Sequence, residues 1–400
     1  MSTNIFKTPF VQLGLFLVTL GTTTLAGADW MGLHEANIWQ SYLHGFWFSI
    51  PFLGILTLHE FGHYLTAKWY QLKVTLPYYI PMYIPFAPSI GTMGAFIKIN
   101  SVMPSKKVVF DVGIAGPLAG FIAAMCLLWY GFTHMPEPAY IYNVHPDYEQ
   151  YGVNYAEKVY SYAYLRAEDS VYSVKNGRKF IPQEQYQVIS TGTNLMFYIF
   201  ENYIANPKSW VPNRFELFHY PFLFAGFLSL IFTAINLLPI GQLDGGHILY
   251  GLIGGKWQRR TAPILFGTFV YLGTLDFLRQ TFDLHPMQSM EDMMSFAPLY
   301  IVFLGLIFSN VSEKLTTNIM IAVIVFVSQY FTLYFFPSFN GFDGWWVFAI
   351  ILGRFLGIYH PPSPDETPLD WKRKILGWLS LVIFILCFSP QPLLIESISR

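Results

Sequence analysis

The chain has 400 residues, of which 54% are hydrophobic and 12% are charged, and its formal net charge is −1. Soluble domains carry about 25% charged residues, so this composition excludes an ordinary soluble protein and favours one that crosses a membrane several times. Because the net charge is close to zero, nothing in the composition indicates a nucleic-acid partner.

The first apolar run, residues 10–28, allows two interpretations. Lys7 precedes it and the small residues Ala26-Gly27-Ala28 end it, a pattern that is typical of a cleaved signal peptide. The run is equally suited to a first membrane helix. We favour the uncleaved helix because the next apolar run must also be inserted and no translocated domain follows immediately.

The second apolar run, residues 45–66, contains His59-Glu60-Phe61-Gly62-His63. Two histidines four residues apart fall on one face of a helix, where both imidazoles can reach a single metal ion. The intervening Glu60 is then close enough to an activated water to take its proton. Ionisable side chains at membrane depth are costly and usually mark a functional site. This run therefore predicts a metal site within the bilayer.

Two long connections separate the following runs. The first, residues 67–111, contains Gly91 and Gly94, after which apolar and polar residues alternate through Ala95, Phe96 and Ile97. This alternation predicts a β-strand opened by a glycine turn. The second, residues 133–218, is rich in tyrosine and of mixed charge, which predicts a small ordered insertion whose fold the sequence does not assign.

The apolar runs together predict an all-α polytopic membrane protein with about eight or nine transmembrane helices, a small cytoplasmic β element and an extracytoplasmic insertion. The runs are 10–28, 45–66, 112–132, 219–238, 262–278, 294–309, 316–336, 344–359 and 375–395. We divide the chain into membrane segments 1–132, the insertion 133–218, membrane segments 219–310 and the C-terminal helices 311–400.

The distribution of lysine and arginine sets the orientation of this layout. With a cytoplasmic N-terminus, the inside loops carry Lys68, Lys73, Lys98, Lys106, Lys107, Lys256, Arg259, Arg260, Lys314, Lys372, Arg373 and Lys374. The short outside loops 29–44 and 337–343 carry no lysine or arginine, and 279–293 has only Arg279. The histidine pair then lies toward the cytoplasmic side.

A third metal ligand has to come from a distant part of the sequence. A catalytic zinc normally has three protein ligands and one open position, and no suitable histidine or acid follows His63 closely. The best candidate is Asp244 in Asn236-Leu-Leu-Pro239-Ile-Gly-Gln-Leu-Asp244-Gly-Gly-His247. By the predicted topology, the run 219–238 ends at the same membrane face as the histidine run. Pro239 and the paired glycines predict an interrupted helix, which is tolerated where the backbone is protected or lines a wet cavity.

His-Glu-x-x-His on one membrane helix, with Asn-x-x-Pro-x-x-x-Leu-Asp-Gly-Gly on a later one, resembles the site-2 protease family of intramembrane zinc metalloproteases. Two further segments are similar to its bacterial and plastid-type members. One begins at Gly91-x-x-Gly94-Ala-Phe-Ile and continues through Pro104-Ser-Lys-Lys-x-x-Phe-Asp111-x-Gly113-x-Ala-Gly116-Pro117-x-Ala-Gly120. The other combines Gly353-Arg354-Phe355 with His360-Pro361-Pro362. No peptide-binding domain of the PDZ type is recognisable in 133–218.

The resemblance implies a role for each matching residue. His59, His63 and Asp244 would hold one zinc ion per chain, and Glu60 would be the catalytic carboxylate. Asn236 would assist near the scissile carbonyl. The strand containing Gly91, Gly94, Ala95, Phe96 and Ile97 would bind the substrate.

Several nearby polar residues have simpler interpretations. His247 could be a ligand or a partner of one, but we favour a polar residue at the membrane surface. We interpret His360, before two prolines, as structural. Gly116 and Gly120 are spaced for close packing of helices.

The function that these patterns favour is zinc-dependent hydrolysis of peptide bonds in or near transmembrane helices of single-pass membrane proteins. The expected location is a bacterial inner membrane, with the active site toward the cytoplasm. The alternatives are a membrane-anchored metalloprotease of unfolded or soluble chains, and a non-proteolytic metal transporter or scaffold. Transport predicts further ligands along several spans, whereas the sequence suggests only one cluster of metal-binding residues.

Overall fold

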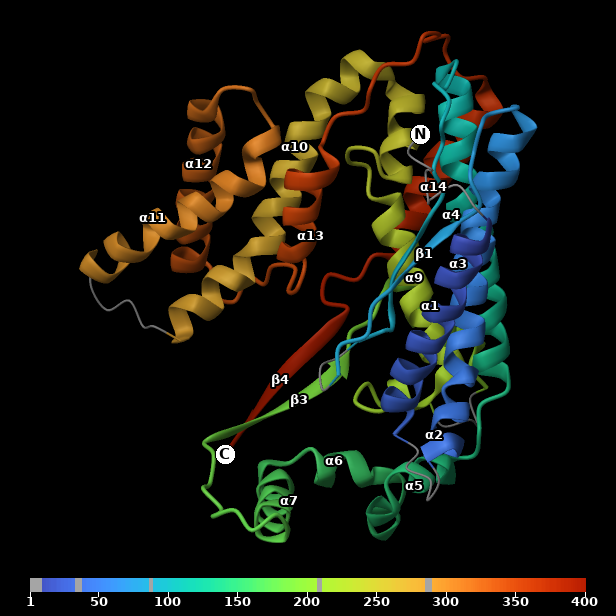
Figure 1. Cartoon of the computed structure of the whole chain (residues 1–400). Coiled ribbons are helices and arrows are strands. Elements are labelled where there is room, and N and C mark those ends of the chain that lie inside the picture. Colours follow the sequence, from blue (N-terminus) through green and yellow to red (C-terminus); the bar gives the residue numbers. More distant parts are fainter. Residues whose placement is uncertain (1–8, 33–37, 86–88, 207–210, 285–289) are drawn as a thin grey trace.

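The computed structural model describes residues 9–32, 38–85, 89–206, 211–284 and 290–400 (Figure 1). Most of these residues are helical, and the strands form two separate two-stranded sheets. The chain is therefore built mainly of helices, as the apolar runs predict.

Five helical segments among the described residues are long and apolar enough to cross a membrane. They are α1 (Pro9–Met31), α3 (Phe46–Trp69) with the preceding α2 (Ile38–His44), α4 (Lys106–Thr133), α10 (Asp244–Leu284) and α12 (Leu315–Phe335). Shorter apolar helices are α9 (Pro221–Leu237), α11 (Met290–Ile307) with a 3-10 turn at Phe308–Asn310, and α13 (Trp346–Ile350) with the π-helical turn Ile351–Leu356. The last helix is α14 (Trp371–Cys387). A multi-spanning membrane protein follows, with five candidate spans.

Helices α3, α4, α9 and the first part of α10 pack against one another as one bundle (Figure 1). Their shared core contains large aromatic side chains such as Phe52, Phe132, Phe224 and Phe227, all fully buried. A second apolar core joins the later part of α10 to α11, α12 and α13, which lie beside this bundle. The long helix α10 is broken at Gly254, whose φ of 75° interrupts the helical backbone.

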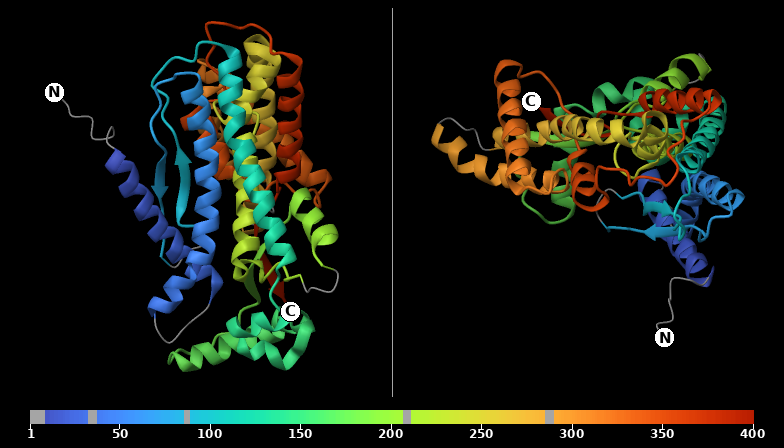
Figure 2. Two further views of the ribbon diagram at one scale, coloured as in Figure 1. Left: turned by 90° about the vertical axis from the view of Figure 1, so that its right-hand side faces the viewer. Right: turned by 90° about the horizontal axis from the view of Figure 1, so that it is seen from above.

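A β-hairpin lies between α1 and α3 (Figure 2). Strand β1 (Tyr78–Pro81) pairs antiparallel with β2 (Thr92–Phe96), and Tyr78 lies opposite Phe96. The strand predicted after Gly94 is therefore present, but its predicted start is wrong. Gly94 lies inside β2, where its φ of 105° is a conformation that glycine adopts easily.

The insertion 133–218 contains short helices and one strand, β3 (Gln185–Thr191). Its helices are α5 (Ile141–Val144), α6 (Tyr155–Val159), α7 (Tyr162–Lys175) and α8 (Leu195–Ile199), with helical turns at Pro138–Tyr140, Pro146–Asn154, Phe200–Ile204 and Leu217–His219. Strand β3 pairs antiparallel with β4 (Leu393–Ser399) from the C-terminus (Figure 1). The C-terminal end of the chain thus completes the sheet of the insertion.

The predicted apolar span 375–395 is wrong at its C-terminal end. Helix α14 ends at Cys387, and residues from Leu393 onward form β4. Pro390 and Pro392 lie between the two elements. Proline lacks the backbone N–H that a continuing helix requires, so the chain leaves the helix before this pair.

Candidate metal centre

His59 and His63 lie one turn apart on α3, and both are buried. Their Nε2 atoms face each other at 3.1 Å. The other ring nitrogen of His63, Nδ1, lies 2.7 Å from the carbonyl oxygen of Val112 on α4. A carbonyl only accepts hydrogen bonds, so Nδ1 carries the proton and Nε2 presents a lone pair toward His59.

Asp244 is the first residue of α10 and brings a carboxylate to the histidine pair. Its Oδ2 atom lies 3.4 Å from Nε2 of His59 and 3.2 Å from Nε2 of His63. Zinc bonds of about 2.0–2.2 Å in a tetrahedral arrangement place neighbouring donor atoms about 3.3–3.6 Å apart. The three predicted ligands therefore converge with the spacing that one divalent cation requires.

Glycines on α4 make room for the two imidazoles. A Cβ atom added to Gly116 would lie 2.1 Å from Nε2 of His63, and one added to Gly120 would lie 3.2 Å from Cβ of His59. On α3, a Cβ at Gly62 would lie 2.5 Å from the carbonyl oxygen of Ala115. The close helix packing predicted for Gly116 and Gly120 thus has a specific use, because it lets the histidines occupy the space between α3 and α4.

The break between α9 and α10 positions Asp244. Helix α9 ends at Leu237, and the chain turns through Gly241, whose φ is 63°. A Cβ at Gly245 would lie 2.0 Å from the carbonyl oxygen of Leu237, and one at Gly246 would lie 2.3 Å from that of Gly241. The two glycines after Asp244 therefore allow the first turn of α10 to sit directly on the end of α9.

Residues near the C-terminus support the same turn of α10. The Nδ1 atom of His247 lies 2.7 Å from Nε2 of His360, and the ring of Tyr250 stacks on His360 at 4.0 Å. Burial lowers the pKa of His360, which keeps its ring neutral and able to accept a hydrogen bond from His247. His247 is thus half-buried and paired with His360, and His360 packs against the helix that carries Asp244.

Glu60 and Asn236 lie beside the histidine–aspartate cluster. An Oε1 atom of the buried Glu60 is 3.9 Å from Nε2 of His59, and Nδ2 of Asn236 is 3.4 Å from the same nitrogen. Both polar groups therefore border the position where a cation would be held. The structure brings together all five residues that the sequence singles out for metal binding and catalysis.

Strand β2 runs along α3 next to this cluster. The backbone N–H of Ile97, directly after β2, interacts with the carboxylate of Glu60. Gly94 faces Phe232 of α9. Gly91 is held farther away, where its carbonyl accepts a hydrogen bond of 2.7 Å from Thr22 of α1. The end of the strand that carries Ala95, Phe96 and Ile97 is thus the part nearest to the cluster.

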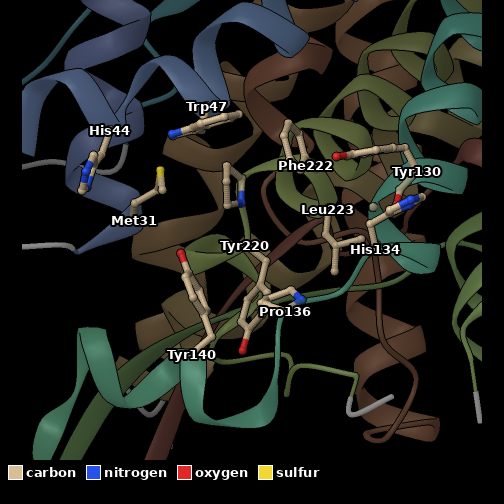
Figure 3. Close-up of a pocket in the computed structure, with 12 residues that line it drawn as sticks. Met31, His44, Trp47, Tyr130, His134, Pro136, Tyr140, Tyr220, Phe222 and Leu223 are labelled. Carbon is tan, nitrogen blue, oxygen red and sulfur yellow. The ribbon is translucent and has the colours of Figure 1, made fainter. Parts of the chain in front are cut away.

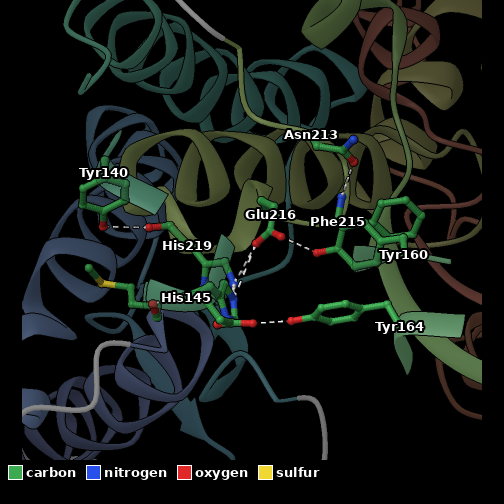
Figure 4. A network of polar contacts seen from close by, with 10 residues as sticks. Tyr140, His145, Tyr160, Tyr164, Asn213, Phe215, Glu216 and His219 are labelled. Carbon is green, nitrogen blue, oxygen red and sulfur yellow. Dashed lines mark hydrogen bonds and ion pairs between the residues drawn. The ribbon is translucent and has the colours of Figure 1, made fainter. Parts of the chain in front are cut away.

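The expectation of a single cluster of metal-binding residues is wrong. Among the described residues, His145, Glu216 and His219 form a second group whose ligand atoms all lie within 4.8 Å of one another (Figure 4). Glu216 and His219 are three residues apart just before α9, but His145 lies in the insertion, 74 residues before His219. The only local signal for this cluster in the sequence is a glutamate and a histidine three residues apart. That spacing is too common to indicate a metal site.

The comparisons with known proteins agree with the first cluster. A family model described as "Peptidase family M50" matches residues 47–275, more than half of the chain. This range contains His59, Glu60, His63, Asn236 and Asp244.

Several curated plant proteins are similar to the chain. It is 28% identical over 202 residues to "Probable zinc metalloprotease EGY1, chloroplastic" of Oryza sativa subsp. japonica, covering 50% of this chain and 27% of that protein. It is 28% identical over 226 residues to the Arabidopsis thaliana protein of the same name, covering 55% and 31%. The "Probable zinc metalloprotease EGY2, chloroplastic" of Oryza sativa subsp. indica is 25% identical over 213 residues, covering 53% and 30%. The chain thus spans less than a third of the length of these relatives. No solved structure matches it.

Proposed function

The chain belongs to peptidase family M50, and we propose that it is a zinc-dependent endopeptidase that cleaves peptide bonds in or next to transmembrane helices. The observation that carries this proposal is the convergence of His59, His63 and Asp244, with Glu60 beside them, on helices long enough to cross a membrane. The relatives named as probable zinc metalloproteases support the same activity.

The three ligands fit a zinc ion, one per chain at this site. Two imidazoles and one carboxylate leave a fourth position open, which is the donor set of a catalytic zinc. The space that Gly116 leaves beside His63 supports this fit, because a Cβ there would collide with the ring. When bound, zinc supplies Lewis-acid polarisation of the scissile carbonyl and activation of the attacking water.

Glu60 then acts as the general base and acid. Its carboxylate is buried beside His59, so it can take a proton from the attacking water and deliver it to the leaving amine. Asn236 reaches the same place from α9 with an amide that can hydrogen-bond the scissile carbonyl.

Strand β2 is the proposed substrate-binding element. A substrate helix hides its carbonyl groups in internal hydrogen bonds, so it must be unwound before the attack. In the described residues β2 pairs with β1 along one edge, and its other edge can receive an extended substrate by strand addition. We propose that the segment Gly91, Gly94, Ala95, Phe96 and Ile97 holds single-pass membrane-protein substrates in this way.

The predicted topology places this site toward the cytoplasm. We propose eight or nine spans in total, which requires the shorter helices α9, α11, α13 and α14 to contribute to the five candidate spans. The charge distribution supports the orientation, with the insertion 133–218 outside. The divisions at residues 132, 218 and 310 and a bacterial inner membrane as the location are part of this proposal.

The decisive test is the variant Glu60→Gln in the purified full-length protein. We expect it to keep its zinc, because Glu60 is not a ligand, and to lose cleavage of a transmembrane substrate by at least about 100-fold. Zinc is measured by mass spectrometry and cleavage by gel assay in nanodiscs. The matched control is Glu157→Gln, at an exposed position on α6, which should behave as the wild type.

Three results would contradict the proposal. Undiminished cleavage by Glu60→Gln would remove the assigned base. Equal turnover of a soluble unfolded chain and a transmembrane substrate would favour a membrane-anchored protease of soluble chains instead. Metal transport into vesicles by the protein, without any cleavage, would favour the transporter alternative.

A further inference from the structure

The second histidine–carboxylate cluster lies at the end of α9 opposite to the first. His219 precedes α9 directly, whereas Asn236 of the first site is in its last turn. With a rise of about 1.5 Å per residue, the 17 residues of α9 separate the two clusters by about 25 Å. The two groups therefore cannot share one ion.

The ligand atoms of this cluster face one another. The Nε2 atoms of His145 and His219 are 3.3 Å apart. The Oε2 atom of Glu216 lies 3.2 Å from Nε2 of His219 and 3.8 Å from Nε2 of His145. These distances resemble the edges of a tetrahedron around a zinc ion, about 3.3–3.6 Å. The first cluster is somewhat tighter, with spacings between 3.1 and 3.4 Å.

The buried carboxylate oxygen lacks any other partner. Glu216 is completely buried, and its Oε2 atom accepts no hydrogen bond. Its 3.2 Å contact with Nε2 of His219 is within ion-pair distance but lacks the geometry of a hydrogen bond. A buried carboxylate oxygen without a hydrogen bond is expensive, and a cation between the three atoms would remove that cost.

Neighbouring groups orient the ligands as they do around known metal sites. The Nδ1 atom of His219 lies 3.1 Å from the carbonyl oxygen of Met31, so Nδ1 carries the proton and Nε2 presents its lone pair. The hydroxyl of Tyr160 donates to the other oxygen of Glu216 (Figure 4). Tyr148 stacks on the ring of His145 at 4.5 Å.

The cluster is accessible from one side. The side chain of His145 is 33% exposed, while those of His219 and Glu216 are buried. None of the three ligands lines the nearby cavity of about 410 Å³, although Met31, Tyr140 and Tyr220, which neighbour His219, do (Figure 3). Tyr140 also donates a hydrogen bond of 3.0 Å to the carbonyl oxygen of His219. An ion can therefore enter, and a fourth ligand position can remain open to solvent.

We propose that His145, Glu216 and His219 form a second divalent-metal site, with zinc as the preferred ion. Two imidazoles and one carboxylate are a donor set that suits zinc. The site joins three parts of the chain: the insertion through His145 and Glu216, the turn just before α9 through His219, and the end of α1 through the Met31 carbonyl. A bound ion would fasten the insertion to the helix whose other end carries Asn236.

The test uses the full-length protein in nanodiscs and zinc alone as the probe. We expect two zinc ions per wild-type chain, one in His63→Ala and one in His145→Gln. The double variant should bind less than a fifth of an ion. Titration of His63→Ala with Co²⁺ should reveal the remaining site by its visible absorption, and His145→Gln or Glu216→Gln on that background should lower the Co²⁺ affinity at least tenfold.

The matched control is His134→Gln, which alters an exposed histidine at the same end of the molecule that is not in the cluster. It should retain two zinc ions. The His63→Ala titration leaves the second cluster intact, so misfolding of a variant there cannot obscure the result.

The outcomes separate this inference from the proposed function. Complete loss of zinc and of Co²⁺ binding in His63→Ala would overturn the second site. Two ions in His145→Gln would place the second ion elsewhere and would also overturn it. A single ion that is lost in His145→Gln and kept in His63→Ala would support the second site while removing the proposed catalytic one.

Discussion

The two histidine–carboxylate clusters have similar ligand sets but different neighbours. Each contains two imidazoles and one carboxylate, and in each a histidine Nδ1 contacts a backbone carbonyl, that of Val112 or that of Met31. The first cluster also has a second carboxylate, Glu60, whose Oε1 atom lies 3.9 Å from His59. In the second, the additional polar neighbour is Tyr160, whose hydroxyl is used to hold Glu216.

This difference distinguishes a cluster that would only bind an ion from one that could also use the ion in catalysis. A metalloprotease needs a group that takes a proton and returns it, and a substrate element that presents the scissile bond. In the proposed function, Glu60 and the end of β2 meet these needs at the first cluster. At the second, the Tyr160 hydroxyl is protonated and donates to Glu216, so it is not available to take a proton from water. We therefore expect catalysis at the first cluster and a structural role at the second, where a bound ion would hold the insertion against α9.

The largest effect should come from closing the space around His63. In Gly116→Ala the new Cβ would lie 2.1 Å from Nε2 of His63, so the ring must leave its position between α3 and α4. We expect at least tenfold less zinc at the first site and at least about 100-fold less cleavage, with the second site still loaded. The zinc content of the purified variant measures the first effect, and a gel-based cleavage assay in nanodiscs measures the second.

The matched control for this substitution is Gly54→Ala on α3. A Cβ at Gly54 would meet nothing within 4 Å, so zinc and cleavage should match the wild type. Full activity in Gly116→Ala would mean that α4 does not confine His63 as the structure shows.

A smaller effect should come from the strand beside the first cluster. Ile97→Pro removes the backbone N–H that interacts with Glu60, at the end of β2 nearest to the site. We expect kcat/KM for a transmembrane substrate to fall about tenfold, with zinc unchanged, since no ligand is touched. Proline also favours an extended conformation at Phe96, which β2 already has, so the strand should survive.

Ile97→Val is the control, because it keeps the N–H and a β-branched side chain. It should cleave at nearly the wild-type rate. Equal kcat/KM in the proline and valine variants would count against a substrate role for this strand.

The first site could be predicted from the sequence because its signals are local. The i, i+4 spacing of His59 and His63 fixes one face of a helix, and Pro239 and the glycines after Asp244 mark an interrupted helix end. The predicted topology was needed only to infer that the segment with the two histidines and the segment with Asp244 end at the same membrane face. The structure places Asp244 beside both histidines.

The insertion could not be predicted because its contacts are distant in sequence. Strand β3 pairs with β4 about 200 residues later, and no local pattern specifies such a partner. His145 and His219 are likewise 74 residues apart. By contrast, the end of α14 could have been predicted, because Pro390 and Pro392 provided a local signal that the apolar composition of the run obscured.

The smallest predicted effect concerns the backbone that supports the second cluster. Gly32 follows α1 with a φ of 64°, and a Cβ there would lie 3.1 Å from Cε1 of His219 and 3.0 Å from Cγ1 of Val144. Gly152 has a nearly equal φ of 61°, but a Cβ there would meet nothing within 4 Å. Alanine at either position should cost about 1 kcal/mol of stability, because an L-residue adopts this conformation reluctantly.

The two alanine variants therefore differ in the contacts that the Gly32 Cβ makes with Val144 and with the His219 ring, and the His219 contact is the one next to the metal ligands. On the His63→Ala background, Gly32→Ala should weaken Co²⁺ binding about threefold or more, because the displaced ring presents Nε2 less well, while Gly152→Ala should leave the affinity unchanged. Equal Co²⁺ affinities in the two variants would show that the position of the His219 ring does not govern binding. The end of α1 would then not be part of the second site, and fastening by the ion would involve only the insertion and α9.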